Sequence, residues 1–182
     1  MRSTTQPRST DVVRGTSHWD GTTALDYRFN DGGRAAAGFT GRAGDCVARS
    51  VAIASGRPYA EVYAALAAGT SEQRAARGRR RQRSARNGIS TGRKWFKDYM
   101  QGLGFRWVPT MRVGAGCQTH LLKGELPTGR LVVAVSRHYV AVIDGCIHDT
   151  HDPTRSILHV NVGMQRLSHR CVYGYWIAGE SL

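Results

Sequence analysis

The chain has 182 residues, a formal net charge of +13 and a sequence pI near 10.5. A chain of this length is typical of one domain, and no apolar run in it is long enough for a membrane span or a secretory signal. We therefore expect a cytoplasmic protein with no membrane partner. Almost all of its cationic residues are arginine, which predicts attraction to nucleic acid or another polyanion.

Four cysteines are spread along the chain, at Cys46, Cys117, Cys146 and Cys171. Their number and scattered spacing do not match the disulfide framework of a small secreted domain. The sequence therefore predicts reduced thiols, with Cys146 and Cys171 as ordinary strand residues.

The first 39 residues are polar, glycine-rich and weakly periodic. They predict a partly flexible arm over 1–39, in which residues 27–30 can add an edge strand. The folded domain is expected over 40–178, with a basic insertion at 72–88.

Three helices are expected in the first half of the domain. Apolar residues at helical spacing predict one helix that begins near Cys46 and a second that begins at Pro58 and ends at Gly69. Ser90 or Thr91 can cap a third helix, which ends by Gly104.

The second half of the chain has the pattern of a mostly antiparallel sheet. Asp144 and Gly145 separate two apolar runs and predict a two-residue hairpin turn. The fold class is therefore α+β, with the cysteine helix packed across the sheet. Strands are expected over 105–108, 131–135, 138–143, 146–150, 157–162 and 171–177.

Gly44, Asp45 and Cys46 form the motif around which the candidate site is built. A cysteine in the first turn of a helix lies near unpaired backbone N–H groups and the positive end of the helix dipole. Both favour the thiolate, which is the nucleophilic form. Cys46 is therefore the candidate nucleophile.

His138 begins a predicted strand, and Asp149 lies in its hairpin partner. If Asp144 and Gly145 form the turn, alternation places His138 and Asp149 on the same face and within reach of each other. Asp149 is therefore the preferred orienting acid, with Asp152 as the alternative if a bulge reverses the faces. Cysteine, histidine and aspartate in this order indicate a thiol hydrolase that acts through an acyl-enzyme and needs no metal or cofactor.

These motifs resemble the papain-like cysteine peptidase superfamily. Within it, the chain is similar to small phage and bacterial proteins that share Gly-Asp-Cys, a Gly-Cys-x-x-His-Leu segment at 116–121 and an aromatic last strand at 173–176. The resemblance also extends to ovarian-tumour-type deubiquitinases. It implies a papain-like fold and a peptidase or isopeptidase, active or degenerate, with Cys46 as nucleophile, His138 as base and Asp149 as orienting acid.

The chain departs from the papain pattern because no glutamine or asparagine shortly precedes Cys46. An oxyanion would then need the Cys46 amide together with an amide of Asp45 or Gly44, or the Thr40 hydroxyl. Cys117 and His120 are further candidates, which either line the cleft or pack locally.

An arginine-rich segment supports a second class of function, a non-enzymatic protein that binds nucleic acid. Guanidinium groups bind phosphate in a bidentate manner and release counterions. No aromatic residue is interleaved in this segment, so base stacking is not indicated. The candidate contacts are Arg77, Arg79, Arg80, Arg81 and Arg83.

Zinc binding is the other chemistry considered. Cys117 with His120, and Cys146 with His148 and His151, are zinc-ligand residue types. The hairpin register places His148 and His151 on opposite faces, so we predict no metal site from these residues.

Overall fold

A computed structural model describes residues 23–72, 84–154 and 170–179. The described chain forms three helices, which follow the first strand and precede the other five, and one six-stranded sheet. The predicted α+β class is therefore confirmed. The predicted strand at 157–162 lies outside the described residues. The helices are α1 (Cys46–Ser55), α2 (Tyr59–Ser71) and α3 (Lys94–Gly102).

The helices begin and end close to the predicted positions. Gly56 ends α1 in a left-handed conformation, and its N–H donates to the carbonyl of Ala52, as expected of a helix C-terminus. Pro58 precedes the first residue of α2. The predicted cap of α3 is wrong, because Arg93 occupies that position without a side-chain bond and the Thr91 hydroxyl instead accepts a hydrogen bond from Tyr139.

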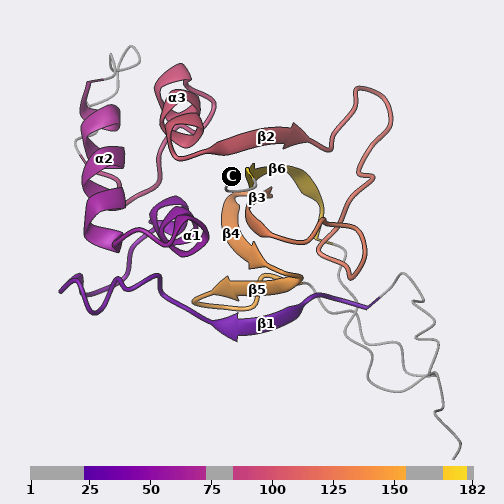
Figure 1. The fold of residues 1–182 in the computed structure, drawn as a ribbon, viewed down its shortest axis with the longest axis horizontal. Coiled ribbons are helices and arrows are strands. Elements are labelled where there is room, and N and C mark those ends of the chain that lie inside the picture. The colour runs from indigo at the N-terminus through magenta and orange to yellow at the C-terminus, as the bar shows by residue number, and fades with distance from the viewer. Residues whose placement is uncertain (1–22, 73–83, 155–169, 180–182) are drawn as a thin grey trace, which may run out of the picture.

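The sheet has the order β1-β5-β4-β3-β6-β2 (Figure 1). All neighbouring strands are antiparallel except β1 and β5, which are parallel at one edge. The strands are β1 (Asp26–Phe29), β2 (Phe105–Pro109), β3 (Arg130–Val135), β4 (His138–Ile143), β5 (Cys146–Asp149) and β6 (Val172–Ala178).

The predicted hairpin register between β4 and β5 is confirmed. Ile143 faces Cys146, and Ala141 faces His148. Asp144 and Gly145 both have positive φ, of 47° and 79°, which is the geometry of a type I′ turn. The side chains of His138 and Asp149 therefore lie on the same face of the sheet.

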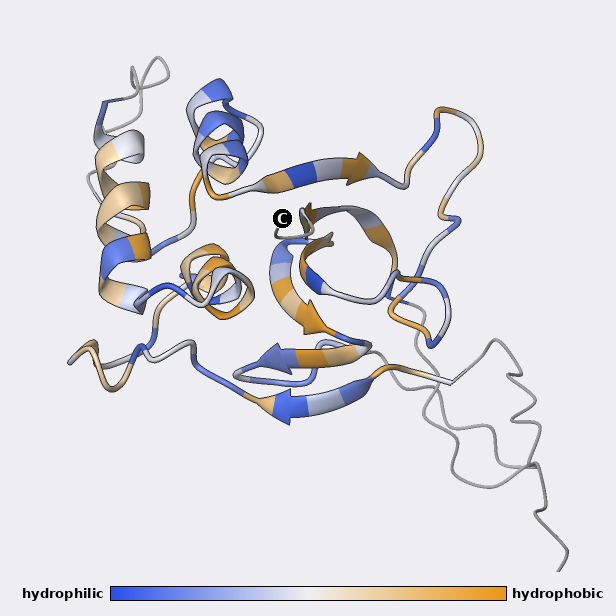
Figure 2. Cartoon of the chain, in the orientation of Figure 1, coloured by the Kyte–Doolittle hydropathy of each residue, from blue (hydrophilic) through white to orange (hydrophobic). Residues whose placement is uncertain are grey.

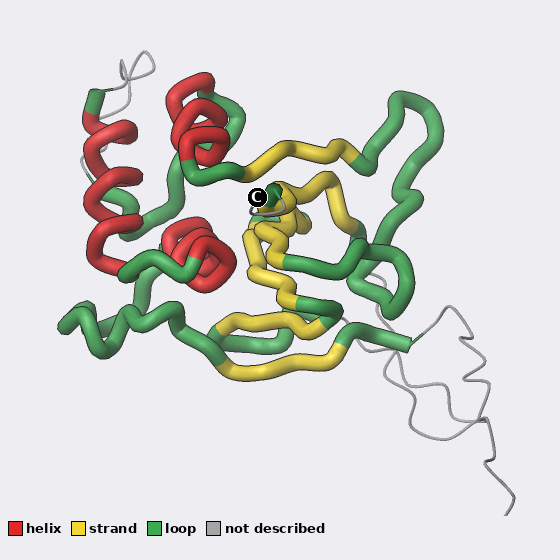
Figure 3. The backbone as a smooth tube through the Cα atoms, in the orientation of Figure 1, coloured by secondary structure: helices red, strands yellow, loops and turns green. Residues whose placement is uncertain are grey.

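The helices cover one face of the sheet, and loops cover the other (Figures 1 and 3). On the helical side, Val51 of α1 and Val62 of α2 are fully buried with Val132 and Ala141 of the sheet. A second cluster, around Leu121, Leu131, Val140 and Ile147, fills the opposite face. Figure 2 shows the apolar residues concentrated on α1 and on the neighbouring strands. Successive side chains of β3 and β4 point alternately into the two clusters, and both clusters are buried. This explains why the sequences of these strands are nearly continuous apolar runs.

The folded unit begins before residue 40. The edge strand proposed at 27–30 forms as β1 over Asp26–Phe29, and Leu25 is buried beside Leu121. After β1, Arg34 reaches back toward α1 and bonds Asp45. Residues 23–39 are thus part of the domain and hold the segment that leads to Cys46.

The side chain of Asp45 lies at the junction of three segments. Its carboxylate accepts hydrogen bonds from Arg34 Nε at 2.8 Å, from Arg49 Nη1 and from the Tyr59 hydroxyl at 2.5 Å. These donors belong to the loop after β1, to α1 and to α2, and Asp45 itself is 1% exposed. A buried carboxylate is costly unless charged donors satisfy it, and here they also fix the three segments relative to one another.

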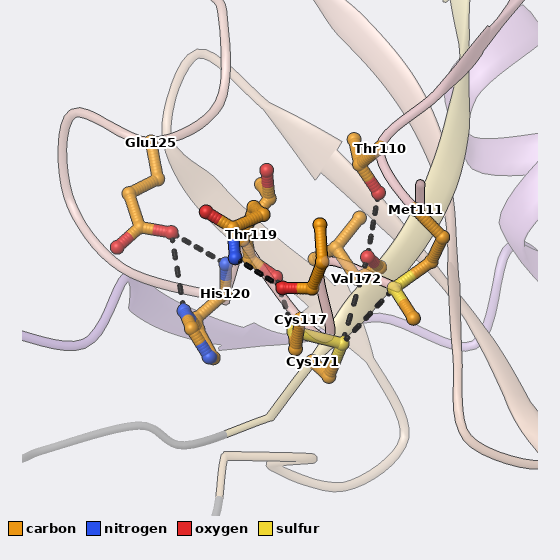
Figure 4. Close-up of a disulfide and its surroundings, with 10 residues drawn as sticks. Thr110, Met111, Cys117, Thr119, His120, Glu125, Cys171 and Val172 are labelled. Carbon is orange, nitrogen blue, oxygen red and sulfur yellow. Dashed lines mark hydrogen bonds and ion pairs between the residues drawn. A yellow bond between two sulfur atoms is a disulfide. The ribbon is translucent and has the colours of Figure 1, made fainter. Parts of the chain in front are cut away.

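The reduced state predicted for two of the cysteines is wrong. Cys117 and Cys171 form a disulfide that joins the loop after β2 to the start of β6 (Figure 4). Beside it, the backbone of His120 pairs with that of Cys171. The pair is 54 residues apart in sequence, so no local spacing indicated it, and closure of a loop of this length contributes about 4 kcal/mol in the chain-entropy model.

Within the described part of the chain, none of the helices has the length and apolar character needed to cross a bilayer.

Replacing Asp45 with asparagine should lower the free energy of unfolding by about 3 kcal/mol, because the Arg34 and Arg49 guanidinium groups would keep their charge without the carboxylate. Urea unfolding followed by circular dichroism measures the change. Asp98→Asn is the matched control, since Asp98 pairs with Lys94 on the exposed face of α3 and should cost less than about 1 kcal/mol. Equal losses in the two variants would show that Asp45 has no special role in stability.

Candidate active site

Cys46 is the first residue of α1 and is partly buried beneath the start of β4. Asp45, the residue before the helix, makes no side-chain capping bond, because its carboxylate is occupied by Arg34, Arg49 and Tyr59. The first-turn N–H groups of α1 are therefore not capped by the residue that usually caps them. Cys46 lies in the first turn of α1, where the helix dipole has its positive end.

His138 lies between Cys46 and Asp149. Its Nε2 atom hydrogen-bonds Asp149 Oδ2, and its ring lies close enough to the Cys46 thiol for their interaction to shift both pKa values. Since Nε2 is used by Asp149, the remaining ring nitrogen, Nδ1, is the one available to Cys46. His138 therefore connects the thiol with the buried carboxylate.

Asp149 is held rigidly and is 3% exposed. Its Oδ1 atom accepts the Thr150 N–H at 2.7 Å, and Arg49 Nη2 lies 3.9 Å from the same oxygen. The Asp149 carbonyl accepts the Asn30 N–H at 2.9 Å, as the parallel strand β1 passes beside β5. The neighbouring strand and the buried guanidinium therefore fix the carboxylate that orients His138.

The hydrogen bonds of this site favour a charged thiolate and imidazolium. Burial alone raises the pKa of Cys46, but the hydrogen bond and charge of His138, the Tyr139 backbone N–H and the charge of Arg49 outweigh it and lower this pKa. Burial alone lowers the pKa of His138, but the bonds to Asp149 and Cys46 outweigh it and raise this pKa to about 9. Both shifts favour the thiolate form of Cys46 and the imidazolium form of His138.

Two cavities meet at Cys46 and His138. One, of about 520 Å³, extends toward β5 and β1 and is called the cationic cavity. It is lined by Phe29, Asp31, Arg34, Gly41, Arg42, Ala43, Gly44, Cys46, Arg49, Arg137, His138, Thr150 and His151.

The other cavity, of about 630 Å³, extends toward β3, β6 and β2 and is called the apolar cavity. Gly44, Arg137, Cys46 and His138 line both cavities, so the dyad stands between them. The apolar cavity is lined by Gly44, Cys46, Val47, Asn87, Gly88, Ile89, Trp107, Ala134, Val135, Arg137, His138, Tyr139 and Tyr173.

Asn87 is a site residue that the sequence did not indicate. It lines the apolar cavity with Cys46 and His138. Its backbone lies beside Gly44, where an added Cβ would stand 3.6 Å from the Asn87 Cα. The fold therefore brings an amide residue from a distant segment into the lining of a cavity that Cys46 shares. Separation of 41 positions explains why no motif pointed to it.

The remaining predicted site residues, Asp45, Thr40 and Asp152, do not contact Cys46 or His138 through any described side-chain hydrogen bond. Asp45 is buried and bonded as described, so its carboxylate does not face either cavity. Thr40 is exposed, and its carbonyl accepts a hydrogen bond from Arg34. Asp152, the alternative acid, is exposed and accepts hydrogen bonds from Thr154, while Asp149 has the bond to His138.

Of the two alternatives for Cys117 and His120, the structure supports local packing rather than the lining of the cleft. Neither lines the cationic or the apolar cavity. Cys117 is in the disulfide, and His120 Nδ1 lies 3.4 Å from the Glu125 carboxylate in the same loop cluster (Figure 4). The reason is topological: this loop covers the face of the sheet opposite to α1. The proposed nucleic-acid contacts Arg77, Arg79, Arg80, Arg81 and Arg83 lie outside the described residues.

One group in the described chain has the composition of a metal site. His138, Asp149 and His151 each offer a ligand atom, and these atoms lie within 4.8 Å of one another. Asp149 already bonds His138 through Nε2, so a metal at that nitrogen would displace the hydrogen bond that orients the ring. His151 is exposed and its ring centroid lies 4.8 Å from that of His138. His148, from the other predicted zinc set, bonds Asn30 instead.

Comparisons of the chain with protein-family models, with curated proteins and with solved structures found no match. The papain-like resemblance therefore stays a prediction. What the site can do has to be argued from its geometry.

Alkylation by iodoacetamide should be faster at Cys46 than at Cys146, because the interaction with His138 lowers the pKa of the Cys46 thiol and favours its thiolate. Peptide mass spectrometry after timed quenching measures both rates in the same sample. The substitution His138→Ala should lower the rate of alkylation at Cys46 and leave the rate at Cys146 unchanged. Equal rates at the two cysteines would exclude an activated thiol.

Proposed function

We propose that the protein is a cysteine hydrolase that cleaves an amide bond through a Cys46, His138 and Asp149 triad. The observation that supports this proposal is one imidazole that hydrogen-bonds a buried carboxylate and interacts with a thiol at a helix N-terminus. Nucleophile, base and orienting group in this geometry are the parts that acyl transfer requires. Two open cavities beside the thiol leave room for a substrate.

In the proposed reaction the Cys46 thiolate attacks the carbonyl carbon and the C=O π electrons move to oxygen. The His138 imidazolium then donates its proton to the departing amine as the C–N bond breaks, leaving a thioester. Neutral His138 next takes a proton from water, which attacks the thioester and releases the acid and the Cys46 thiolate. Asp149 holds the Nε2–H throughout, so Nδ1 remains the nitrogen that exchanges protons.

Two donors are proposed for the oxyanion. The backbone N–H of Cys46 belongs to the first turn of α1, which has no side-chain cap. The side-chain amide of Asn87 is the second, supported by its position in the cavity that Cys46 lines. Together they replace the donor that is absent from the residues before Cys46.

Peptide and isopeptide bonds are the proposed substrate class. Both have the planar amide carbonyl that the mechanism needs, and the cavities on the two sides of the dyad can hold groups on both sides of the bond. No described residue closes over the dyad in a way that limits the site to a small molecule.

Trapping of an acyl-enzyme tests the proposal. Incubation with a fluorogenic peptide-amide library should give hydrolysis, and an activated acyl ester should add one acyl group to Cys46 in intact-mass spectra. Cys46→Ala should abolish both. Asp149→Asn should lower kcat about 10²- to 10⁴-fold, because the imidazole loses its orienting charge. Acylation spread evenly over Cys46 and Cys146, or hydrolysis that survives in Cys46→Ala, would refute the assignment.

The pH profile of hydrolysis should be bell-shaped. Activity should rise with pH as Cys46 ionises and should fall as pH passes about 9, where His138 loses the proton that the leaving amine needs. Alkylation of Cys46 should not show this alkaline decline, since it needs only the thiolate. Asp149→Asn should move the alkaline limb of the residual activity to lower pH, because the bond and charge that raise the pKa of His138 are removed.

Asn87→Ala should lower kcat about 10²- to 10³-fold with little change in the rate of Cys46 alkylation. The reason is that the amide contributes only when an oxyanion forms, and alkylation by iodoacetamide forms none. Steady-state kinetics and the alkylation assay are compared on the same preparation. An equal decline in both rates would show that Asn87 acts on the thiol or on folding instead.

A further inference from the structure

The cationic cavity carries an excess of positive charge close to the nucleophile. Four arginines line it, and Asp31 is the one carboxylate among its lining residues in the described chain. The Asp31 carboxylate is already engaged, accepting backbone N–H groups of Gly33 at 2.9 Å and Ala35 at 2.8 Å. The arginines are Arg34, Arg42, Arg49 and Arg137.

Two of these arginines are balanced by the buried carboxylates. Arg34 and Arg49 both pair with Asp45, and Arg49 also lies near Asp149. Even so, Arg49 keeps a buried Nε atom with no hydrogen-bond partner among the described residues. The excess positive charge of the cavity therefore comes from its other two arginines, Arg42 and Arg137.

The other two arginines are exposed at the mouth of the cavity. Neither Arg42 nor Arg137 has a carboxylate within ion-pair distance in the described part of the chain. Arg86 adds a third guanidinium at this rim, since it donates to the Arg42 carbonyl at 3.0 Å. Arg137 is held at φ 57° in the two-residue turn between β3 and β4, directly before His138. An anionic group bound here would lie next to the dyad.

The cavity on the opposite side of the dyad is lined mostly by apolar residues, and Arg137 lies where the two cavities meet. The apolar cavity is walled by Trp107, Ile89, Val135 and Tyr173, and the Tyr173 side chain is 42% exposed. A large apolar group would bury this surface. The two cavities lie on the two sides of β4 in the sheet order, so a chain that crosses the dyad enters both.

We propose that the substrate is a peptide with an acidic residue on one side of the cleaved bond, held by Arg42 and Arg137, and an apolar residue on the other, held by the apolar cavity. This inference rests on the proposed amide hydrolysis. Bidentate guanidinium contacts suit a carboxylate, and Arg42 and Arg137 are specificity-determining residues for it. A nucleic-acid strand offers anions but no amide carbonyl in its backbone for Cys46 to attack, which favours the peptide.

The test maps cleavage in a proteome-derived peptide library by mass spectrometry, using the full chain. We expect Asp or Glu to be enriched about tenfold or more over Asn and Gln on one side of the cleaved bond, with aromatic or aliphatic residues on the other. In the double variant Arg42→Gln with Arg137→Asn, the acidic enrichment should fall to about one while cleavage continues. Asparagine is chosen at 137 because it tolerates positive φ.

The control is Arg106→Gln, on an exposed position of β2 that lines neither cavity, and it should keep the acidic preference. A wild-type protein that cleaves no more than Cys46→Ala would refute the hydrolase itself. Cleavage without acidic preference, or with a preference that survives in the double variant, would refute this inference alone. A short single-stranded oligonucleotide is tested as an inhibitor in parallel. If it inhibits the wild type but not the double variant, and peptides show no acidic preference, the cationic cavity is a phosphate site and the inference of an acidic peptide substrate is overturned.

Discussion

The buried carboxylate of Asp45 is the interaction on which the site depends. It is satisfied by Arg34, Arg49 and Tyr59, three donors from three different segments. Because the carboxylate oxygens already accept hydrogen bonds from these donors, the carboxylate does not cap α1. The first-turn N–H groups of the helix therefore lie beside Cys46 without a side-chain cap. The three hydrogen bonds of the Asp45 carboxylate thus determine both the position of Cys46 and the charges around it.

Arg49 extends this interaction to the other end of the triad. It pairs with Asp45 through Nη1 and lies 3.9 Å from Asp149 through Nη2. Burying separate charges here would cost several kcal/mol each, and the alternation of guanidinium and carboxylate groups offsets much of that cost. The same arrangement places the Asp149 carboxylate between the Arg49 guanidinium and the His138 ring. The imidazolium and thiolate then add a further pair of opposite charges, with their pKa values shifted toward the ion pair.

Local patterns in the sequence were sufficient for much of this fold. The apolar spacing after Cys46 and after Pro58 predicts α1 and α2, and the Asp144-Gly145 turn predicts the β4–β5 register, from which the pairing of His138 with Asp149 follows. Contacts between distant segments had no such signal. The Cys117–Cys171 disulfide joins residues 54 positions apart, and the parallel pairing of β1 with β5 joins residues 120 positions apart. No sequence pattern near either partner predicts these contacts.

The sequence by itself determined the order of cysteine, histidine and aspartate and the parity that aligns the last two, because hairpin geometry is a local property of turn and alternation. Only the tertiary structure decided what surrounds them. It brought Asn87 beside Gly44, and it placed Arg42 in the cavity on one side of the dyad and Trp107 in the cavity on the other. It also placed Cys117 on the opposite face of the sheet. The physical reason is that these neighbours are set by the packing of helices and loops on the two faces of the sheet, which depends on the whole buried core at once.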